Sequence, residues 1–315
     1  MEVKVKKVEY IYTYVAMEEE RSLCELEMRS FFGPGEYTMV IKNDIRIDPS
    51  RSPFMKERIE IMFEGESWED FLEPAKTLYT EEKTFKVQFA KIQDPGFKVS
   101  YEQRLHIERS IGWEMPGDAD IKNPDILFGI VVYEGRWYFG RMEQSTAVWL
   151  HHLKKPREYS TALSTRVARA VANIAVPHPE GIKAIDPCCG IGTVLVEALS
   201  MGIDIDGRDI NPLVTDGSRE NIAYFGLAGN VTTGPISEVD KEYDVTIIDM
   251  PYNLYTHATP EDQLAILKHA RRFSKKAVIV SIDTVDSMIK EAGFVIKDRC
   301  VARKANFARQ VLVCE

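Results

Sequence analysis

The sequence predicts an α/β protein with a doubly wound, mostly parallel sheet in its C-terminal half and an α+β region before it. Three observations support this fold class. The 315 residues are enough for about two domains with separate cores. After residue 177, short apolar runs alternate with amphipathic helical stretches, as in βαβ units. The last two strand-like runs have no helix between them, which predicts a terminal antiparallel hairpin at the sheet edge.

The composition is that of an ordinary globular protein, with 44% hydrophobic and 28% charged residues. No apolar run approaches the roughly 18 residues of a membrane helix. The first seven residues alternate and are charged, unlike a signal peptide. The five cysteines match neither a disulfide framework nor a metal-binding spacing. We therefore expect a cytoplasmic protein without a metal centre or a membrane association.

The net charge of −9 argues against general coating of nucleic acid. Two stretches depart from this balance. Residues 265–309 carry 11 basic and 4 acidic side chains, and residues 151–169 carry five basic and one acidic. These stretches could bind an anionic partner, or they could be solvated helix faces.

The N-terminal half predicts an α+β region with two lobes, residues 1–80 and 81–150. A glycine turn at Glu134–Arg136 separates two aromatic runs and predicts a hairpin. The expected strands are 10–15, 36–41, 59–63, 84–89, 128–133 and 137–140. The expected helices are 23–31, 67–78 and 100–111.

The third predicted domain, residues 151–315, begins with the polar link His151–Arg157. A helix with apolar residues at three- and four-residue spacing follows, from residue 160 or 161 to Pro177. Strands and helices then alternate. The expected strands are 183–186, 203–209, 230–233, 244–249, 277–281, 294–301 and 307–314. The expected helices are 193–200, 212–224, 260–273 and 283–291.

A glycine-rich turn joins the first of these strands to its helix and reads Asp186-Pro187-Cys188-Cys189-Gly190-Ile191-Gly192-Thr193. The glycines permit a tight turn and let a ligand approach the backbone, while the following helix directs free N–H groups at that ligand. The spacing is not the G-x-G-x-x-G fingerprint of dinucleotide sites. An aspartate four residues before the first glycine suits a ligand with a positively charged amino group.

Two further acidic strand ends complete the candidate site. Asp209 ends the second strand, where a carboxylate can accept both hydroxyls of a ribose. Asp249-Met250-Pro251-Tyr252 ends the fourth strand, and binding crevices lie at such carboxyl ends. There Asp249 and the Met250 carbonyl could accept hydrogen bonds from an amine, and Tyr252 could stack on a planar base. The alternative is a structural turn with a packed tyrosine.

For two other pairs of reactive side chains we expect a structural role and not a catalytic or metal-binding one. Adjacent His151 and His152 point apart and lack a third metal ligand nearby, so we expect a linker. Cys188 and Cys189 could supply a nucleophile, but no His/Asp partners can be assigned to them. We expect them to be small turn residues.

Together these motifs resemble class I S-adenosylmethionine-dependent methyltransferases, and within them the amino-group RNA methyltransferases with a DPPY-type fourth motif. The resemblance implies a Rossmann-like sheet of five parallel strands plus the hairpin, S-adenosylmethionine as cofactor, and methyl transfer to an exocyclic amine. The cofactor-binding residues that it implies are Asp186, Cys188, Gly190, Gly192, Thr193, Asp209 and Ile210. The catalytic residues that it implies are Asp249, Met250, Pro251 and Tyr252.

The upstream half is similar to the end of a THUMP domain with its preceding ferredoxin-like lobe. The similarity rests on Thr84–Phe89 with its following helix, on Asp120–Ile126 and on the aromatic hairpin. THUMP domains bind the end of a tRNA acceptor stem. The whole resemblance therefore points to THUMP-containing tRNA guanine-N2 methyltransferases, with a structured RNA, first of all tRNA, as partner of a monomeric enzyme.

The sequence departs from that family at two places. Met250 stands where the fourth motif has its first proline, and Thr233-Gly234-Pro235-Ile236 lacks the acid that contacts the adenine amino group. Two other functions stay open: an RNA-binding module whose catalytic domain has lost activity, and an adenine-N6 methyltransferase acting on rRNA or DNA.

Overall fold

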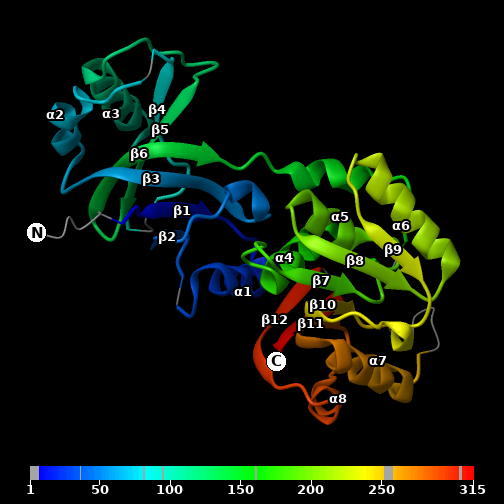
Figure 1. The fold of residues 1–315 in the computed structure, drawn as a ribbon. Coiled ribbons are helices and arrows are strands. Elements are labelled where there is room, and N and C mark those ends of the chain that lie inside the picture. The colour runs from blue at the N-terminus through cyan, green and yellow to red at the C-terminus, as the bar shows by residue number, and fades with distance from the viewer. Residues whose placement is uncertain are drawn as a thin grey trace, which may run out of the picture. The chain divides into compact units, whose positions relative to one another are not determined.

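The computed structural model describes residues 7–35, 37–80, 82–93, 96–159, 162–251, 258–304 and 307–315. The chain divides into two compact units, each with its own sheet (Figure 1). Unit 1 comprises the residues up to Val15 and Gly35–Thr146. Unit 2 comprises Ala16–Pro34 and Ala147–Glu315.

Unit 1 is built on a six-stranded sheet in the order β2-β1-β3-β6-β5-β4. β4 and β5 are parallel, and the other neighbouring strands are antiparallel. The strands are β1 (Tyr10–Tyr14), β2 (Val40–Asn43), β3 (Met55–Gly65), β4 (Phe85–Phe89), β5 (Ile126–Tyr133) and β6 (Arg136–Gln144). The helices described in this unit are η2 (Pro49–Arg51), η3 (Trp68–Phe71), α2 (Leu72–Ala75) and α3 (Tyr101–Glu114).

Aromatic side chains form the core between this sheet and its helices. Phe128 and Phe139 are fully buried and stack with their ring centroids 5.6 Å apart. Ala75 of α2 and Ile111 of α3 belong to the same apolar cluster. The predicted hairpin is confirmed: Glu134 and Gly135 form its turn with φ angles of 50° and 73°, as a type I′ turn requires.

Unit 2 contains a seven-stranded sheet in the order β12-β13-β11-β10-β7-β8-β9. β9, β8, β7, β10 and β11 are parallel, and β13 is antiparallel to both β11 and β12. The predicted parallel sheet with a terminal antiparallel hairpin is therefore confirmed. The strands are β7 (Lys183–Asp186), β8 (Asp204–Asp209), β9 (Asn230–Thr233), β10 (Tyr243–Asp249), β11 (Ser274–Ser281), β12 (Ile296–Lys304) and β13 (Phe307–Cys314).

Helices cover both faces of this sheet. Leu267 and Ile289 pack on one face, in a cluster with Ile248, Ile279 and Leu312 of the strands. α4 contacts β10, β11 and β13 as well as α1 and α5. The helices described in unit 2 are η1 (Glu18–Glu20), α1 (Arg21–Phe32), η4 (Val148–Lys154), α4 (Thr165–Ala175), α5 (Thr193–Ser200), α6 (Pro212–Tyr224), η5 (Ile236–Glu238), α7 (Pro260–Phe273) and α8 (Asp286–Glu291).

The division of the chain differs from the predicted domains in two respects. Residues on both sides of the expected boundary at residue 80 contribute strands to one sheet, because β3 pairs with β6. Residues 16–34 belong to unit 2, although their neighbours in sequence belong to unit 1. The amphipathic pattern of α1 predicts a helix, but it does not say which unit covers its apolar face.

Polar contacts fix α1 within unit 2. The Asn173 side chain of α4 donates to Glu27 Oε1 at 2.7 Å, and both residues are fully buried. Arg29 donates through Nε and Nη2 to the two carboxylate oxygens of Asp298, at 2.8 and 3.0 Å. Such a two-point contact between a guanidinium and a carboxylate fixes orientation as well as distance.

A buried ionic cluster links η4, α4 and α5. Glu197 is fully buried, and its two oxygens contact His152 Nδ1 at 2.7 Å and Arg169 Nη1 at 2.6 Å. Arg169 also donates to Ser200 Oγ at 3.0 Å. His152 is therefore a structural residue, consistent with the interpretation of the histidine pair as a linker and not as a metal site.

We expect Glu197→Ala to lower the free energy of unfolding by about 3–5 kcal/mol, because it leaves the buried Arg169 guanidinium without this carboxylate. Urea denaturation measures the change. The matched control is Glu220→Ala, which removes the exposed partner of Arg157 and should cost less than about 1 kcal/mol. Equal losses in the two variants would contradict a structural role for the cluster.

Candidate functional site

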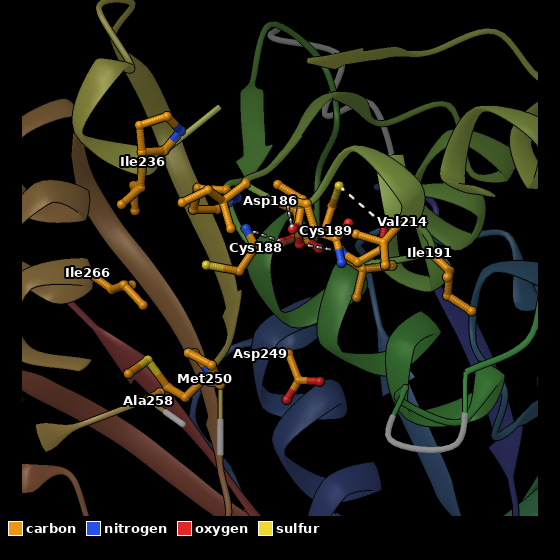
Figure 2. Close-up of a pocket in the computed structure, with 18 of the residues that line it drawn as sticks. Asp186, Cys188, Cys189, Ile191, Val214, Ile236, Asp249, Met250, Ala258 and Ile266 are labelled. Carbon is orange, nitrogen blue, oxygen red and sulfur yellow. Dashed lines mark hydrogen bonds between the residues drawn. The ribbon is translucent and has the colours of Figure 1, made fainter. Parts of the chain in front are cut away.

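Three acidic side chains meet at one edge of the unit 2 sheet. Asp186, Asp209 and Asp249 are the last residues of β7, β8 and β10, which run parallel to one another. All three line a cavity of about 730 Å³ (Figure 2). The cavity therefore lies at the carboxyl ends of the strands, where open α/β sheets bind their ligands.

The predicted glycine turn forms the wall between β7 and α5. The Gly190 N–H donates to Asp209 Oδ2 at 3.0 Å, and the Cys188 N–H donates to Asp186 Oδ1 at 3.2 Å. Gly190 has a φ of +51°, and a Cβ added there would meet no atom within 4 Å. The backbone at Gly190 is thus open for a ligand to approach.

At Gly192 a glycine is required by the packing of neighbouring helices and not by access of a ligand. Its φ is +77°, and an added Cβ would lie 2.2 Å from Ser218 Oγ of α6. Unlike the other predicted cofactor residues, Gly192 is not among those that line the cavity. It permits the close approach of α5 and α6 behind the turn.

Burial raises the pKa of two carboxyls in the cavity, those of Asp186 and Asp249. The pKa of Asp249 rises to about 7 because desolvation outweighs the opposing effect of the Arg309 charge. The pKa of Asp186 is raised well above its ordinary value, first by burial and then by the charges of Asp249 and Asp209. Two buried polar atoms that line the cavity, Asp249 Oδ1 and Thr193 Oγ1, have no hydrogen-bond partner among the described residues.

The adjacent cysteines are not poised for nucleophilic chemistry. Burial, together with the nearby carboxylates, raises the pKa of both thiols, Cys188 and Cys189, so they stay protonated at neutral pH. Both line the cavity as small, weakly polar groups. This agrees with their interpretation as turn residues.

The fourth motif contributes both a cavity wall and a core residue. Met250 is 1% exposed, belongs to the apolar cluster beneath α7 and donates its N–H to the Val280 carbonyl at 2.9 Å. The Pro251 carbonyl accepts from Gln263 Nε2 of α7 at 2.8 Å. Methionine in place of the family's proline therefore fills core volume and keeps an N–H that a proline lacks. Tyr252 lies outside the described residues.

The loop after β9 closes the cavity next to Asp209. Gly234 donates its N–H to the Asp209 carbonyl at 2.9 Å, and Arg208 Nε donates to the Pro235 carbonyl at 2.9 Å. Pro235 and Ile236 line the cavity. These contacts hold the loop in place, although it lacks the acid that the resembled family has at this position.

Sequence reasoning missed one wall of the cavity. Asp262, Ile266 and His269 of α7 line it at i, i+4 and i+7, so one side of this helix faces the cavity. Tyr159 and Leu163, before α4, also line it. The helical spacing was readable in the sequence, but which side of α7 faces a cavity depends on how the helix packs.

The basic stretches serve the fold in large part. Arg271 and Arg272 donate to backbone carbonyls, and Lys276 donates to two carbonyls at the end of α4. Arg299 pairs with Asp286, and Lys268 pairs with Glu291. For these residues a structural role explains the positive charge without an anionic partner.

Within the described part of the chain, no cluster of His, Cys, Asp or Glu side chains could hold a metal ion. The same residues include no helix that is long and apolar enough to cross a membrane. All five cysteines are free thiols.

Comparison with known families shows what this part of the chain is similar to. Residues 153–292, which contain the cavity's motifs, match the family described as RMKL-like, methyltransferase domain. This part of unit 2 is similar to a methyltransferase domain. The five parallel strands and the terminal hairpin of unit 2 are those that the resemblance to class I methyltransferases implies.

Several proteins with known names are similar to this chain. The chain is 26% identical over 206 residues to a tRNA (guanine(10)-N2)-dimethyltransferase of Methanothermobacter thermautotrophicus, covering 60% of this chain and 56% of the relative. It is 25% identical over 271 residues to the Pyrococcus abyssi protein of that name, covering 81% and 80%. TrmN from Thermus thermophilus has a similar structure at 16% identity, with a TM-score of 0.48 over 98% and 99% of the two chains. The chain thus spans little more than half of the first relative.

The raised pKa of Asp249 predicts a pH-dependent stability of unit 2. Between about pH 4 and pH 7 the folded state keeps a proton on Asp249 that the unfolded state releases, so the free energy of unfolding falls as the pH rises. Asp249→Asn removes this effect, and at pH 8 it should unfold with a free energy roughly 2–4 kcal/mol higher than the wild type. Urea denaturation from pH 4 to pH 8 measures both curves. Parallel curves would contradict the assignment.

Proposed function

We propose that this protein transfers a methyl group from S-adenosylmethionine to the N2 amine of a guanine in tRNA. The observation that carries the proposal is the convergence of Asp186, Asp209 and Asp249 on one cavity of a methyltransferase domain. The named relatives support the choice of guanine N2 and of tRNA, since two of them carry that activity in their names.

The cavity fits the proposed cofactor in charge, size and polarity. S-adenosylmethionine supplies an electrophilic methyl group on a positively charged sulfur. Four carboxyl groups line the space, those of Asp186, Asp209, Asp249 and Asp262. A volume of about 730 Å³ is typical of small-molecule sites. The orphaned Thr193 hydroxyl and the open backbone at Gly190 offer further polar contacts. We assign cofactor binding to Asp186, Cys188, Gly190, Thr193, Asp209 and Ile210, with Gly192 shaping the turn.

The fourth motif would hold the amine that receives the methyl group. Asp249 Oδ1 is buried, lines the cavity and has no partner among the described residues, so it can accept a hydrogen bond from an amine N–H. That contact would orient the nitrogen lone pair, and orientation is a large part of catalysis when the methyl donor is already reactive. With a pKa of about 7, the same carboxylate can accept the proton that the methylated amine releases. We assign Met250, Pro251 and Tyr252 to positioning the base.

Unit 1 is the proposed RNA-binding part. The support is the similarity of residues 81–150 to a THUMP domain and of residues 1–80 to the lobe that precedes it. The division of unit 1 into lobes 1–80 and 81–150 stays a prediction. So do the monomeric state and the cytoplasmic location.

The test is incubation of the protein with methyl-labelled S-adenosylmethionine and unmodified total RNA, followed by separation of tRNA and nucleoside analysis. The proposal expects label in N2-methylguanosine from the tRNA fraction. Label in N6-methyladenosine would favour the adenine methyltransferase. Cofactor and RNA binding without any label would favour an inactive binding module.

We expect Asp249→Ala to slow methyl transfer at least about a hundredfold, the scale of losing one oriented polar partner of a transition state. At pH 5, where the wild-type Asp249 is protonated, its affinity for S-adenosylmethionine, measured by calorimetry, should stay close to that of the wild type. Asp209→Ala is the matched comparison, since losing a charge-assisted ribose contact should weaken cofactor binding by roughly 1.5–3 kcal/mol. A folded Asp249→Ala protein with wild-type turnover would refute this role.

A further inference from the structure

The cavity lacks an obvious acceptor for a nucleobase amine on the side of the β9 loop. Thr233 to Ile236 contains no acid. Three carbonyls of the loop already accept hydrogen bonds. Pro235 O accepts from the Glu238 N–H and from Arg208, Ile236 O from the Val239 N–H, and Ser237 O from Arg272. The loop therefore offers a purine bound next to Asp209 no side-chain acceptor at these positions, and another element could supply one.

α7 supplies the neighbouring wall. Arg272, near its C-terminal end, donates to the carbonyls of Ser237 and Val239 at 2.8 Å each, which holds this end of the helix against η5. His269 precedes Arg272 by three residues, so the two side chains project from the same side of α7. His269 and Ser237 both line the cavity. The imidazole is thus placed at the end of the cavity formed by η5.

The surroundings of this end suit a flat apolar ring. Figure 2 shows Ile236 and Ile266 on the left, Val214 on the right, and Cys188 in the space between these two sides. Cys188, Ile236 and Ile266 pack against the apolar cluster beneath α7. A ring seated here would contact aliphatic side chains over its faces and find few polar atoms at its edge.

We infer that His269 binds the adenine edge of the cofactor and takes the place of the missing acid after β9. This inference rests on the proposed function. His269 is half-buried, and no hydrogen bond or ion pair is recorded for it with another described residue. A neutral imidazole carries one nitrogen that accepts and one that donates, so it can accept from the exocyclic amine of adenine.

The other polar side chain on this side of α7 is already engaged. Asp262 closes the N-terminal cap of the helix, where its Oδ2 accepts from the Thr259 N–H and hydroxyl at 2.9 Å each. These contacts lower the pKa of Asp262 and hold the carboxylate at the start of α7. Asp262 lies seven residues, about two helical turns, before His269 and so faces a different part of the cavity.

Calorimetric titration with S-adenosylhomocysteine and with 5′-methylthioadenosine tests the inference without requiring turnover. His269→Phe keeps an aromatic ring and removes both ring nitrogens, and we expect it to weaken both ligands by about tenfold. The factor should be equal because both ligands carry the adenine, whereas only the first carries the amino acid. His269→Gln restores a donor and an acceptor and should recover most of the affinity.

The matched control is Lys268→Ala, at the adjacent position of α7, which pairs with Glu291 and does not line the cavity. It should bind both ligands as the wild type does. A second readout is the ¹⁵N spectrum of the imidazole, in which the ring nitrogens of His269 should shift when either ligand is added.

The outcomes separate this inference from the proposed function. If the wild type binds neither ligand, the proposed function and the role of His269 are both contradicted. If the wild type binds both ligands and folded His269→Phe binds them as tightly as Lys268→Ala, only the role of His269 is overturned. A loss confined to S-adenosylhomocysteine would assign His269 to the amino-acid part of the ligand and would also overturn the inference.

Discussion

The parallel pairing of β7 with β8 and with β10 is the constraint on which the site depends. Because these strands run in the same direction, the acids that end them, Asp186, Asp209 and Asp249, are brought to one edge of the sheet. Desolvation there raises the pKa of Asp249 to about 7 and favours a positively charged ligand that can offset the carboxylates. A cavity of this charge is poorly suited to a pyrophosphate.

The rest of unit 2 holds those strand ends in place. The glycine turn links β7 to β8 through the contact between Gly190 and Asp209, and Met250 anchors the end of β10 in the core beneath α7. On the other side, α1 joins α4 through the buried contact between Glu27 and Asn173. The helix from the N-terminal part of the chain is thereby part of the unit that carries the cavity.

The positions of the motifs that end strands could be predicted from the sequence. The positions of side chains that depend on helix packing could not. Alternating strands and helices predict a parallel sheet, and a parallel sheet brings its strand-end acids together whatever the details of packing. His269 and Ile266 are different, since the spacing of α7 does not tell which side faces a cavity. The position of residues 16–34 was missed for the same reason, because an amphipathic helix does not specify its partner.

The most direct test of the electrostatic account is the number of protons released when S-adenosylmethionine binds. A positive ligand beside Asp249 should lower the raised pKa of this carboxyl, so binding near pH 7 should release protons. Calorimetry of one titration in buffers of different ionisation enthalpy measures this number. The account predicts proton release that shrinks in Asp249→Asn. Binding enthalpies independent of the buffer, or proton uptake, would contradict it.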